Sequence, residues 1–495
     1  MTNSDKQEAE SKSRDFDTGR RNFIKTAAAT GLLGTVGVAP VLDFRAKGAQ
    51  PSTTQGPSRP FHLEEATIAD VHGAFLAKEL TVVQLVQFYL NRIAAYNGVC
   101  VNGAVDPATG LRLGDISPIE NAGQINALIT LNVRGKRSKT DPVDNDPGMP
   151  DALETARALD AHLAKTGKLI GPLHGIPMAV KDLCDTRDMR STNGAEAMYG
   201  NDRPPRDCEV VARLRKAGAI ILAKANEGDY ANGDRSTYGG NACNPYDTSR
   251  SPGRSSGGPG AATAANLVMC GIGEETGQSV RNPAANESLV GIVPTFGLVS
   301  RVGMMPWTLA QDRAGVLSRT VEDGAIVLGA IAGNDPKDPS TAASYGQMPR
   351  EAYGSFARGA SLKGVRLGVV REFMQRINEA DDESIAVISE AIAELRRLGA
   401  TIVDPGPDGQ LFATAMAEIV STLDGASLVA SFPDFFPKGG EIKKLIEISL
   451  GKSPMPPEAT MRWYLGNGFP ESEGSFASGQ TPFVIDSYLM QRGDS

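Results

Sequence analysis

The sequence predicts an α/β fold, because helical and strand patterns alternate along the chain. Residues 210–217 carry a helical pattern, and residues 219–223 form a short apolar strand pattern directly after it. Further along, two strand patterns at 365–370 and 400–403 flank a helical stretch over 382–398. Such alternation is typical of a sheet covered by helices. We therefore expect one large domain with a mixed sheet and helices on both of its faces.

The elements between residues 81 and 167 are predicted by local signals. Thr81-Val82-Val83-Gln84 has the form of a capping box that begins a helix. The apolar residues that follow at helical spacing are Val82, Leu85, Val86, Tyr89, Leu90 and Ile93. Residues 127–131 predict a short buried strand, and the stretch 134–150, rich in Pro, Gly and charge, predicts an exposed loop. A second helix is indicated by Leu153, Ala156, Leu159 and Leu163, and Gly167 is placed to end it.

The middle of the chain predicts a strand, a helix and a second strand. The apolar run 176–180 favours a strand that carries Lys181 at its end. Residues 258–269 are Ala-rich and helix-like, and 271–273 predict a strand after them. A helix running out and an extended segment running back would bring their two flanking loops side by side. Another helix is expected over 320–333.

The composition is ordinary for a soluble globular enzyme. The chain has 495 residues, of which 41% are hydrophobic and 22% charged, and its formal net charge is −8. Nucleic-acid binding normally shows a basic patch or a high isoelectric point, so no nucleic-acid partner is expected. The oligomeric state stays open, with a homodimer among the options.

The N-terminal stretch predicts export. Arg20-Arg21 precedes a weakly apolar segment, which is the layout of a twin-arginine signal. We assign residues 1–48 to this signal, 49–60 to a linker and 61–495 to the main domain. A retained membrane anchor is the alternative, but the apolar part is interrupted and short for a membrane span. The expected location of the mature chain is the periplasm or the exterior, without stable membrane insertion.

The cysteines do not predict disulfide bonds, and the histidines do not predict a metal centre. Five cysteines are an odd number, and none lies in a Cys-x-x-Cys pair. We expect all of them to be free thiols. The four histidines show no ligand spacing, so no metal site is predicted.

Three segments carry the pattern of a hydrolytic site. They are Ile176-Pro177-Met178-Ala179-Val180-Lys181-Asp182, Gly253-Arg254-Ser255-Ser256-Gly257-Gly258 and Glu275-Thr276-Gly277-Gln278-Ser279-Val280-Arg281. A serine hydroxyl needs an adjacent base to act as a nucleophile, and a lysine kept neutral by burial can supply one. The apolar residues before Lys181 are compatible with such burial. Alone, each motif would be a plain loop or a surface lysine.

The order and spacing of these segments resemble the amidase signature family of amide hydrolases. Ser279 lies 24 residues after Ser255, as in the family pattern. Flanking segments that share the resemblance are Lys224-Ala225-Asn226-Glu227, Asn244-Pro245-Tyr246-Asp247 and Pro294-Thr295-Phe296-Gly297-Leu298-Val299-Ser300-Arg301. The resemblance implies a cofactor-free enzyme that hydrolyses a small-molecule amide through a serine acyl-enzyme.

The resemblance also implies a role for each residue of the site. Ser279 would be the nucleophile, Ser255 the bridging serine that follows a cis peptide bond, and Lys181 the ultimate base. The oxyanion would be bound by backbone N–H groups, and the candidates are those of Thr276, Gly277, Gln278 and Ser279. Two positions depart from the family, because Arg254 and Gln278 each replace a glycine. The family's closing Asp-x-Leu-x-x-Pro-Thr strand does not occur before Ser495, so we expect the chain to depart from the family at its C-terminus or to be incomplete.

The same residues allow other functions. The run 253–257 matches a Gly-x-Ser-x-Gly nucleophile elbow, but no histidine follows His174 to complete that triad. A phosphate-binding loop is disfavoured because the Gly-x-x-x-x-Gly-Lys form is absent from the sequence. The runner-up is an amidase-like binding protein whose site is closed by Arg254 and Gln278. An amidotransferase component, and a hydrolase of esters, anilides or carbamates, are further alternatives.

Overall fold

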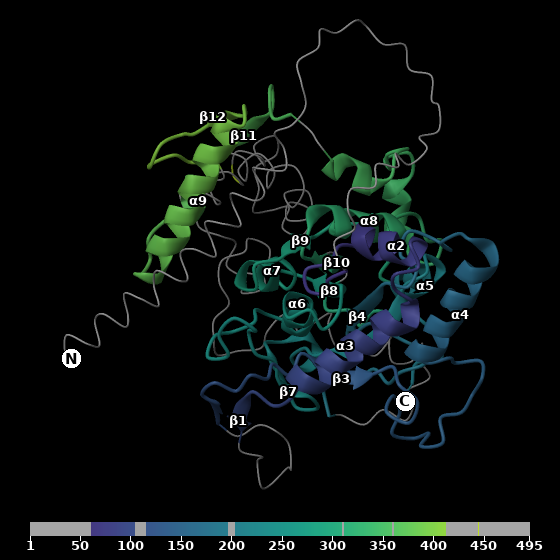
Figure 1. Ribbon diagram of the computed structural model, residues 1–495. Coiled ribbons are helices and arrows are strands. Elements are labelled where there is room, and N and C mark those ends of the chain that lie inside the picture. The colour runs from purple at the N-terminus through teal and green to yellow at the C-terminus, as the bar shows by residue number, and fades with distance from the viewer. Residues whose placement is uncertain are drawn as a thin grey trace, which may run out of the picture. The chain divides into compact units, whose positions relative to one another are not determined.

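The computed structural model describes residues 61–103, 115–196, 203–308, 311–358, 361–411 and 444 (Figure 1). The predicted export signal and linker, residues 1–60, lie outside the described residues, as does nearly all of the chain beyond residue 411. Among the described residues, no helix combines the length and the apolar character that a membrane span requires.

A six-stranded mixed sheet forms the centre of the domain, as predicted. Its strand order is β3-β5-β4-β8-β10-β9. These strands are β3 (Leu128–Leu131), β5 (Ile220–Ala225), β4 (Pro177–Lys181), β8 (Cys270–Glu275), β10 (Arg313–Ser318) and β9 (Val290–Ile292). β4 runs parallel to both β5 and β8, whereas the other pairs are antiparallel. The C-terminal ends of β5, β4 and β8 therefore meet at one edge of the sheet.

Helices flank this sheet (Figure 1). They are α2 (Ile68–Leu76), α3 (Val82–Tyr96), α4 (Ala152–Thr166), α5 (Glu209–Lys216), α6 (Gly257–Ala264), α7 (Arg281–Asn286) and α8 (Val321–Ile331). α6 packs against β4, β8 and β10, α8 against β9 and β10, and α4 and α5 against β5. The fold class predicted from the sequence is confirmed.

Two predicted helix ends are confirmed by their hydrogen bonds. Thr81 accepts a hydrogen bond from the backbone N–H of Gln84, whose side chain accepts one from Thr81 in return, so the capping box begins α3. Gly167 ends α4 with a left-handed φ of 65°, a conformation that glycine adopts without steric cost. The helix predicted over 258–269 is shorter and ends at Ala264, because Asn266 adopts a left-handed φ of 53° and turns the chain toward β8.

Short elements lie outside the main sheet. The paired strands are β1 (Val101–Gly103) with β2 (Ile116–Pro118), β6 (Arg235–Ser236) with β7 (Gly240–Asn241), and β11 (Arg366–Gly368) with β12 (Thr401–Val403). The 3-10 helices are η1 (Asp229–Ala231), η2 (Pro339–Ser344), η3 (Tyr353–Ala357) and η4 (Arg371–Phe373). β11 and β12 are parallel and are joined through α9 (Ala380–Arg397), as predicted. Among the described residues, β11 and β12 pair with each other as a two-stranded sheet of their own.

The stretch 134–150 is a loop, but the prediction that it is exposed is wrong for two of its residues. Arg137 and Asp144 have no exposed side-chain surface, and Nε of Arg137 lies 2.9 Å from Oδ2 of Asp144. The guanidinium also donates to the carbonyl oxygens of Met149 and Pro150. The two charges can be buried because each is paired and hydrogen-bonded inside the loop.

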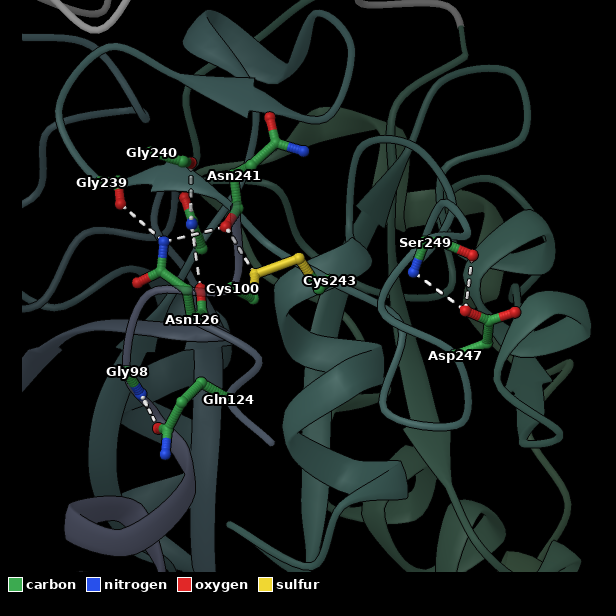
Figure 2. Close-up of a disulfide and its surroundings, with 11 residues drawn as sticks. Gly98, Cys100, Gln124, Asn126, Gly239, Gly240, Asn241, Cys243, Asp247 and Ser249 are labelled. Atoms are coloured by element: carbon green, nitrogen blue, oxygen red, sulfur yellow. Dashed lines mark hydrogen bonds between the residues drawn. A yellow bond between two sulfur atoms is a disulfide. The ribbon is translucent and has the colours of Figure 1, made fainter. Parts of the chain in front are cut away.

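The prediction that all five cysteines are free thiols is also wrong. Cys100 and Cys243 form a disulfide across a sequence separation of 143 residues. Figure 2 shows the Asn126 amide beside it, donating to the carbonyl oxygens of Gly239 and Asn241 and so fixing the backbone next to Cys243. An odd number of cysteines does not exclude one pair between distant segments. The remaining three cysteines, Cys184, Cys208 and Cys270, are free and buried.

Candidate active site

Lys181 lies at the C-terminal end of β4, where the apolar run places it, and its side chain is fully buried. Its Nζ donates to Oγ of Ser255 at 2.6 Å. It also donates to the backbone oxygen of Glu274 at 3.3 Å and to Oε2 of Glu274 at 3.1 Å. The end of β4 thus holds the lysine amine against a serine hydroxyl, and no part of the lysine side chain is exposed to water.

Ser255 is presented by the loop before α6. The peptide bond between Arg254 and Ser255 is cis, as the sequence resemblance implied. Arg254 is exposed, so its long side chain has room in solvent. Gly253 adopts a φ of 92°, and a Cβ there would lie 2.6 Å from the backbone nitrogen of Pro283, so only glycine fits. Ser256, next in the chain, exchanges hydrogen bonds with the backbone of Glu274 and joins this loop to β8.

Ser279 follows β8, and its loop lies beside the Ser255 loop, as the predicted helix and strand required. The backbone N–H of Ser256 donates to the carbonyl oxygen of Ser279 at 3.2 Å. The Ser279 side chain is half-buried, and its hydroxyl forms no hydrogen bond with any described residue. In the structure, Lys181 hydrogen-bonds to Ser255. Ser279 is held next to this pair through its backbone carbonyl oxygen and not through its side chain. Catalytic hydrogen bonds are often long in unliganded enzymes and tighten around substrate.

The loop from Thr276 to Ser279 presents unused donors. Within the described part of the chain, the backbone N–H groups of these four residues donate no hydrogen bond. The side chain of Glu275, which is fully buried, fixes this loop by hydrogen bonds to the two residues that follow it. Its Oε2 accepts the backbone N–H groups of Val280 and Arg281, each at 3.0 Å, and its Oε1 accepts Nε of Arg281 at 2.8 Å. Such preorganised N–H groups can bind an oxygen that gains negative charge.

Two buried carboxyl groups lie beside the lysine, and the sequence did not predict them. Burial of Lys181 is confirmed, but its neighbours include Glu274 and also Glu227, whose Oε2 lies 3.7 Å from Nζ. Burial raises the pKa of Glu227 to about 8. Burial likewise raises the pKa of Asp312 to about 7, and the charge of Glu274 adds to this shift. A lysine in apolar surroundings differs from a lysine beside carboxylates, because a carboxylate stabilises the ammonium form.

A second buried lysine lies next to this site. Nζ of Lys224, on β5, donates to the backbone oxygens of Asp182 at 2.9 Å and Cys184 at 2.6 Å, and lies 3.5 Å from Oδ1 of Asp182. Oδ2 of Asp182 accepts both the backbone N–H and the hydroxyl of Thr192. These contacts fasten the turn that follows Lys181.

Sequence reasoning missed the acidic residues of the site. Glu227 lies in one of the flanking segments that share the family resemblance, whereas none of the motifs includes Glu274 or Asp312. One signal was present in the sequence, since Glu274 and Glu275 are two adjacent carboxylates directly before the Thr276–Ser279 loop. Alternating positions on a strand point to opposite sides, so one of the pair can face the lysine while the other supports the loop.

Comparison with known proteins matches this arrangement to one family. The family model described as Amidase matches residues 145–476. A glutamyl-tRNA(Gln) amidotransferase subunit from Azoarcus sp. is 34% identical over 369 residues, covering 74% of this chain and 66% of the relative. Its counterpart from Salinispora arenicola is 41% identical over 255 residues, 51% of each chain. The chain thus spans about half to two thirds of the length of these curated relatives.

Solved structures give the same result. The crystal structure of native peptide amidase from Stenotrophomonas maltophilia is 30% identical, with a TM-score of 0.54, over 88% of this chain and 84% of that one. A peptide amidase in complex with the competitive inhibitor chymostatin is 35% identical over 76% of this chain and 69% of that one, with the same TM-score of 0.54. The chain therefore belongs to the amidase family, the amidase signature family that its three motifs resemble.

Proposed function

We propose that this protein hydrolyses a linear carboxylic amide, with Ser279 as the nucleophile, Ser255 as the bridging serine and Lys181 as the base. The observation that carries the proposal is the buried contact of 2.6 Å between Nζ of Lys181 and Oγ of Ser255. A serine in this contact can pass a proton between a second serine and the lysine. Membership of the amidase family and the position of Ser279 beside Ser256 support the same assignment.

The proposed cycle conserves protons within the site. Neutral Lys181 accepts the proton of Ser255 while Ser255 accepts that of Ser279, whose oxygen attacks the amide carbonyl carbon. The free N–H groups of the Thr276–Ser279 loop stabilise the oxyanion. As the C–N bond breaks, the relay returns the proton to the leaving amine. Water then attacks the acyl-enzyme ester and gives a proton to Lys181 through Ser255. As the carboxylic acid leaves, the relay returns that proton to the oxygen of Ser279.

The two residues that replace glycines leave the lysine–serine contact intact. Arg254 and Gln278 are both exposed, whereas Lys181 and Ser255 are buried. We therefore favour an active hydrolase over an amidase-like binding protein. We expect no cofactor, because the proposed chemistry needs only the two serines, the lysine and water. We expect no nucleic-acid partner, because the formal net charge is −8.

The substrate class is proposed from the relatives. The solved structures include peptide amidases, and the curated relatives belong to amidotransferases, so their names share action on an amide group. Export favours hydrolysis of a small-molecule amide over a role as an amidotransferase subunit bound to partner proteins. Export by the twin-arginine route rests on Arg20-Arg21, and the Cys100–Cys243 disulfide supports an oxidising compartment.

The test is a panel of peptide amides, free glutamine, anilides, esters and carbamates, offered to wild type, Ser279→Ala and Lys181→Ala. Turnover of amides by wild type, lost in both variants with unchanged circular dichroism, is the expected result. Preference for another bond class would reassign the substrate. Absence of turnover in a folded wild type would contradict the proposal and favour a binding protein. Release of ammonia from glutamine alone would favour an amidotransferase component.

A further inference from the structure

The exposed charges on the two segments that hold the serines of the site, 251–258 and 274–282, are positive. Both acidic side chains of these segments are buried, whereas both basic ones are exposed. The acidic residues are Glu274 and Glu275, and the basic residues are Arg254 and Arg281. A substrate that approaches Ser279 therefore meets positive charge on these segments, although the formal net charge of the chain is −8. Such a local field attracts anions.

The two arginines differ in what already occupies them. Nε of Arg281 donates to Oε1 of Glu275 at 2.8 Å, and its guanidinium also donates to the carbonyl oxygen of Gly277. Arg254, by contrast, forms no hydrogen bond and no ion pair with any described residue. The charge of Arg281 is thus offset by a buried carboxylate, whereas the guanidinium of Arg254 keeps its donors for another group.

Other charged residues close to this segment leave Arg254 unpaired. The carboxylate of Asp234 contacts the segment, because the hydroxyl of Ser251 donates to its Oδ2 at 3.2 Å, but it forms no ion pair with Arg254. Arg250, just before the segment, is paired with Asp247 at 3.1 Å. Within the described part of the chain, Arg254 is therefore a cation whose counter-charge comes from outside these residues.

The position of Arg254 in the chain places it beside the leaving group of the proposed reaction. Arg254 directly precedes Ser255, whose Oγ lies 2.6 Å from Nζ of Lys181. Ser255 returns the proton to the leaving amine, so that amine has to lie within hydrogen-bond reach of Oγ. The carbonyl oxygen of the substrate lies instead toward the free N–H groups of residues 276–279. A substituent on the amine is therefore the part of the substrate closest to Arg254.

We propose that Arg254 is a specificity residue that binds a carboxylate carried by the leaving amine, so that the preferred substrates are N-acyl amino acids. This inference rests on the proposed function, because Ser255 and Ser279 must act there as relay and nucleophile. The planar guanidinium fits a carboxylate through two parallel hydrogen bonds. Hydrolysis adds water across the C–N bond and releases the carboxylic acid and the free amino acid.

The first test compares kcat/KM for three amides that differ only in whether a carboxylate or an isopropyl group stands at one end. N-isohexanoylglycine carries the carboxylate on the amine, N-isobutylsuccinamate carries it on the acyl group, and N-isobutylisohexanamide has none. Wild type should prefer the glycine compound over the neutral amide by about tenfold to a hundredfold, the usual contribution of hydrogen bonds to a charged group.

Variants of Arg254 assign this preference to the guanidinium. Arg254→Gln should bring the ratio for the two compounds close to one, and Arg254→Glu should invert it. Arg254→Lys should keep only part of it, because an ammonium is a point charge without the planar fork. Raising the ionic strength from about 0.1 M to about 1 M should also weaken the preference, since charges are then screened over about 3 Å instead of about 10 Å.

Arg250→Gln is the matched control, because it makes the same substitution on an exposed arginine shortly before Arg254, and its ratio should equal that of wild type. Equal ratios in wild type and Arg254→Gln would overturn the proposal. A preference for N-isobutylsuccinamate alone that disappears in Arg254→Gln would overturn it too, because the guanidinium would then bind the acyl side.

A second readout is independent of hydrolysis. Calorimetry measures the binding of N-isohexanoylglycine and of the neutral amide to Ser279→Ala, with and without Arg254→Gln. The added substitution should weaken binding of the glycine compound about tenfold or more and leave the neutral amide unchanged. Equal affinities, or no binding of the glycine compound, would overturn the proposal. If wild type hydrolyses no amide, the proposed function fails and binding alone decides the role of Arg254. If amides are hydrolysed but neither ratio nor affinity depends on Arg254, only its role in specificity fails.

Discussion

Nζ of Lys181 and Oγ of Ser255 lie 2.6 Å apart, although 74 residues separate them in sequence. β4 supplies the lysine at its C-terminal end, and the loop before α6 supplies the serine. Ser256 fixes that loop by exchanging two hydrogen bonds with the backbone of Glu274 on β8. The contact thus joins the end of β4 to a loop that is hydrogen-bonded to β8, the neighbouring parallel strand.

The first prediction separates the bridging serine from the nucleophile. Ser255→Ala should lower kcat/KM about 10²- to 10⁴-fold, the usual contribution of a positioned proton-transfer group. Ser279 should still be labelled by a fluorophosphonate in this variant, but more slowly, because the hydroxyl remains and only its proton path is lost. Ser279→Ala should give no label. The measurement combines steady-state kinetics with intact-mass analysis of the labelled protein.

Ser249→Ala is the control for this experiment. Ser249 is exposed and bonds only to Asp247 among the described residues (Figure 2), so its loss should leave kcat/KM within a few-fold of wild type. Equal labelling rates in wild type and Ser255→Ala would contradict a relay through Ser255.

The second prediction concerns the pH dependence of stability. Glu227 has a pKa of about 8 in the folded protein and 4.5 as a model group. The folded state therefore holds this proton more tightly than the unfolded chain does. Its contribution to stability is complete below about pH 4.5 and is lost as the pH rises through 8. Glu227→Gln should remove this slope, so its free energy of unfolding relative to wild type should rise by a few kcal/mol between pH 5 and 8.

Chemical denaturation at four pH values between 5 and 8 measures this difference. Glu390→Gln, an exposed glutamate on α9, is the control and should follow the wild-type curve. If the curves of Glu227→Gln and wild type run parallel, the buried carboxyl does not hold an extra proton.

Local signals predicted much of the fold and the serine and lysine positions of the site. The capping box at Thr81, the helix end at Gly167 and the strand end at Lys181 each depend on a few adjacent residues, so sequence alone suffices. The loops of Ser255 and Ser279 could be paired because a helix and a returning strand fill the 24 residues between them.

Features made by distant segments could not be predicted. Glu227 and Glu274 meet Lys181 only because three strands end at one edge of the sheet. Asp312 lies directly before a fourth strand and is linked to Glu274 through the Thr276 hydroxyl. A run of charged residues is normally exposed, and nothing local in the sequence distinguishes Arg137 and Asp144 from their solvated neighbours. The Cys100–Cys243 pair has a sequence separation of 143 residues, which no spacing rule covers.

The third prediction concerns this disulfide. Replacing both Cys100 and Cys243 by serine should lower the free energy of unfolding by about 2–5 kcal/mol, because the unfolded chain is no longer closed into a long loop. A reductant should have the same effect on wild type and none on the double variant. Alkylation of denatured, unreduced protein should label three of the five cysteines. Labelling of all five in protein purified from an oxidising compartment would contradict the pairing.

The last prediction compares a buried ion pair with an exposed one. Arg137→Ala should destabilise the protein by about 3 kcal/mol, because the buried Asp144 then loses its nearest cation and keeps only the longer contact of 3.5 Å with Arg203. Arg250→Ala removes the same side chain from a pair with Asp247 in which both residues are largely exposed, and should cost less than about 1 kcal/mol. Urea denaturation of both variants at pH 7 measures the difference. A similar loss of unfolding free energy in both variants would contradict the burial of the Arg137–Asp144 pair, because an exposed ion pair contributes little to stability.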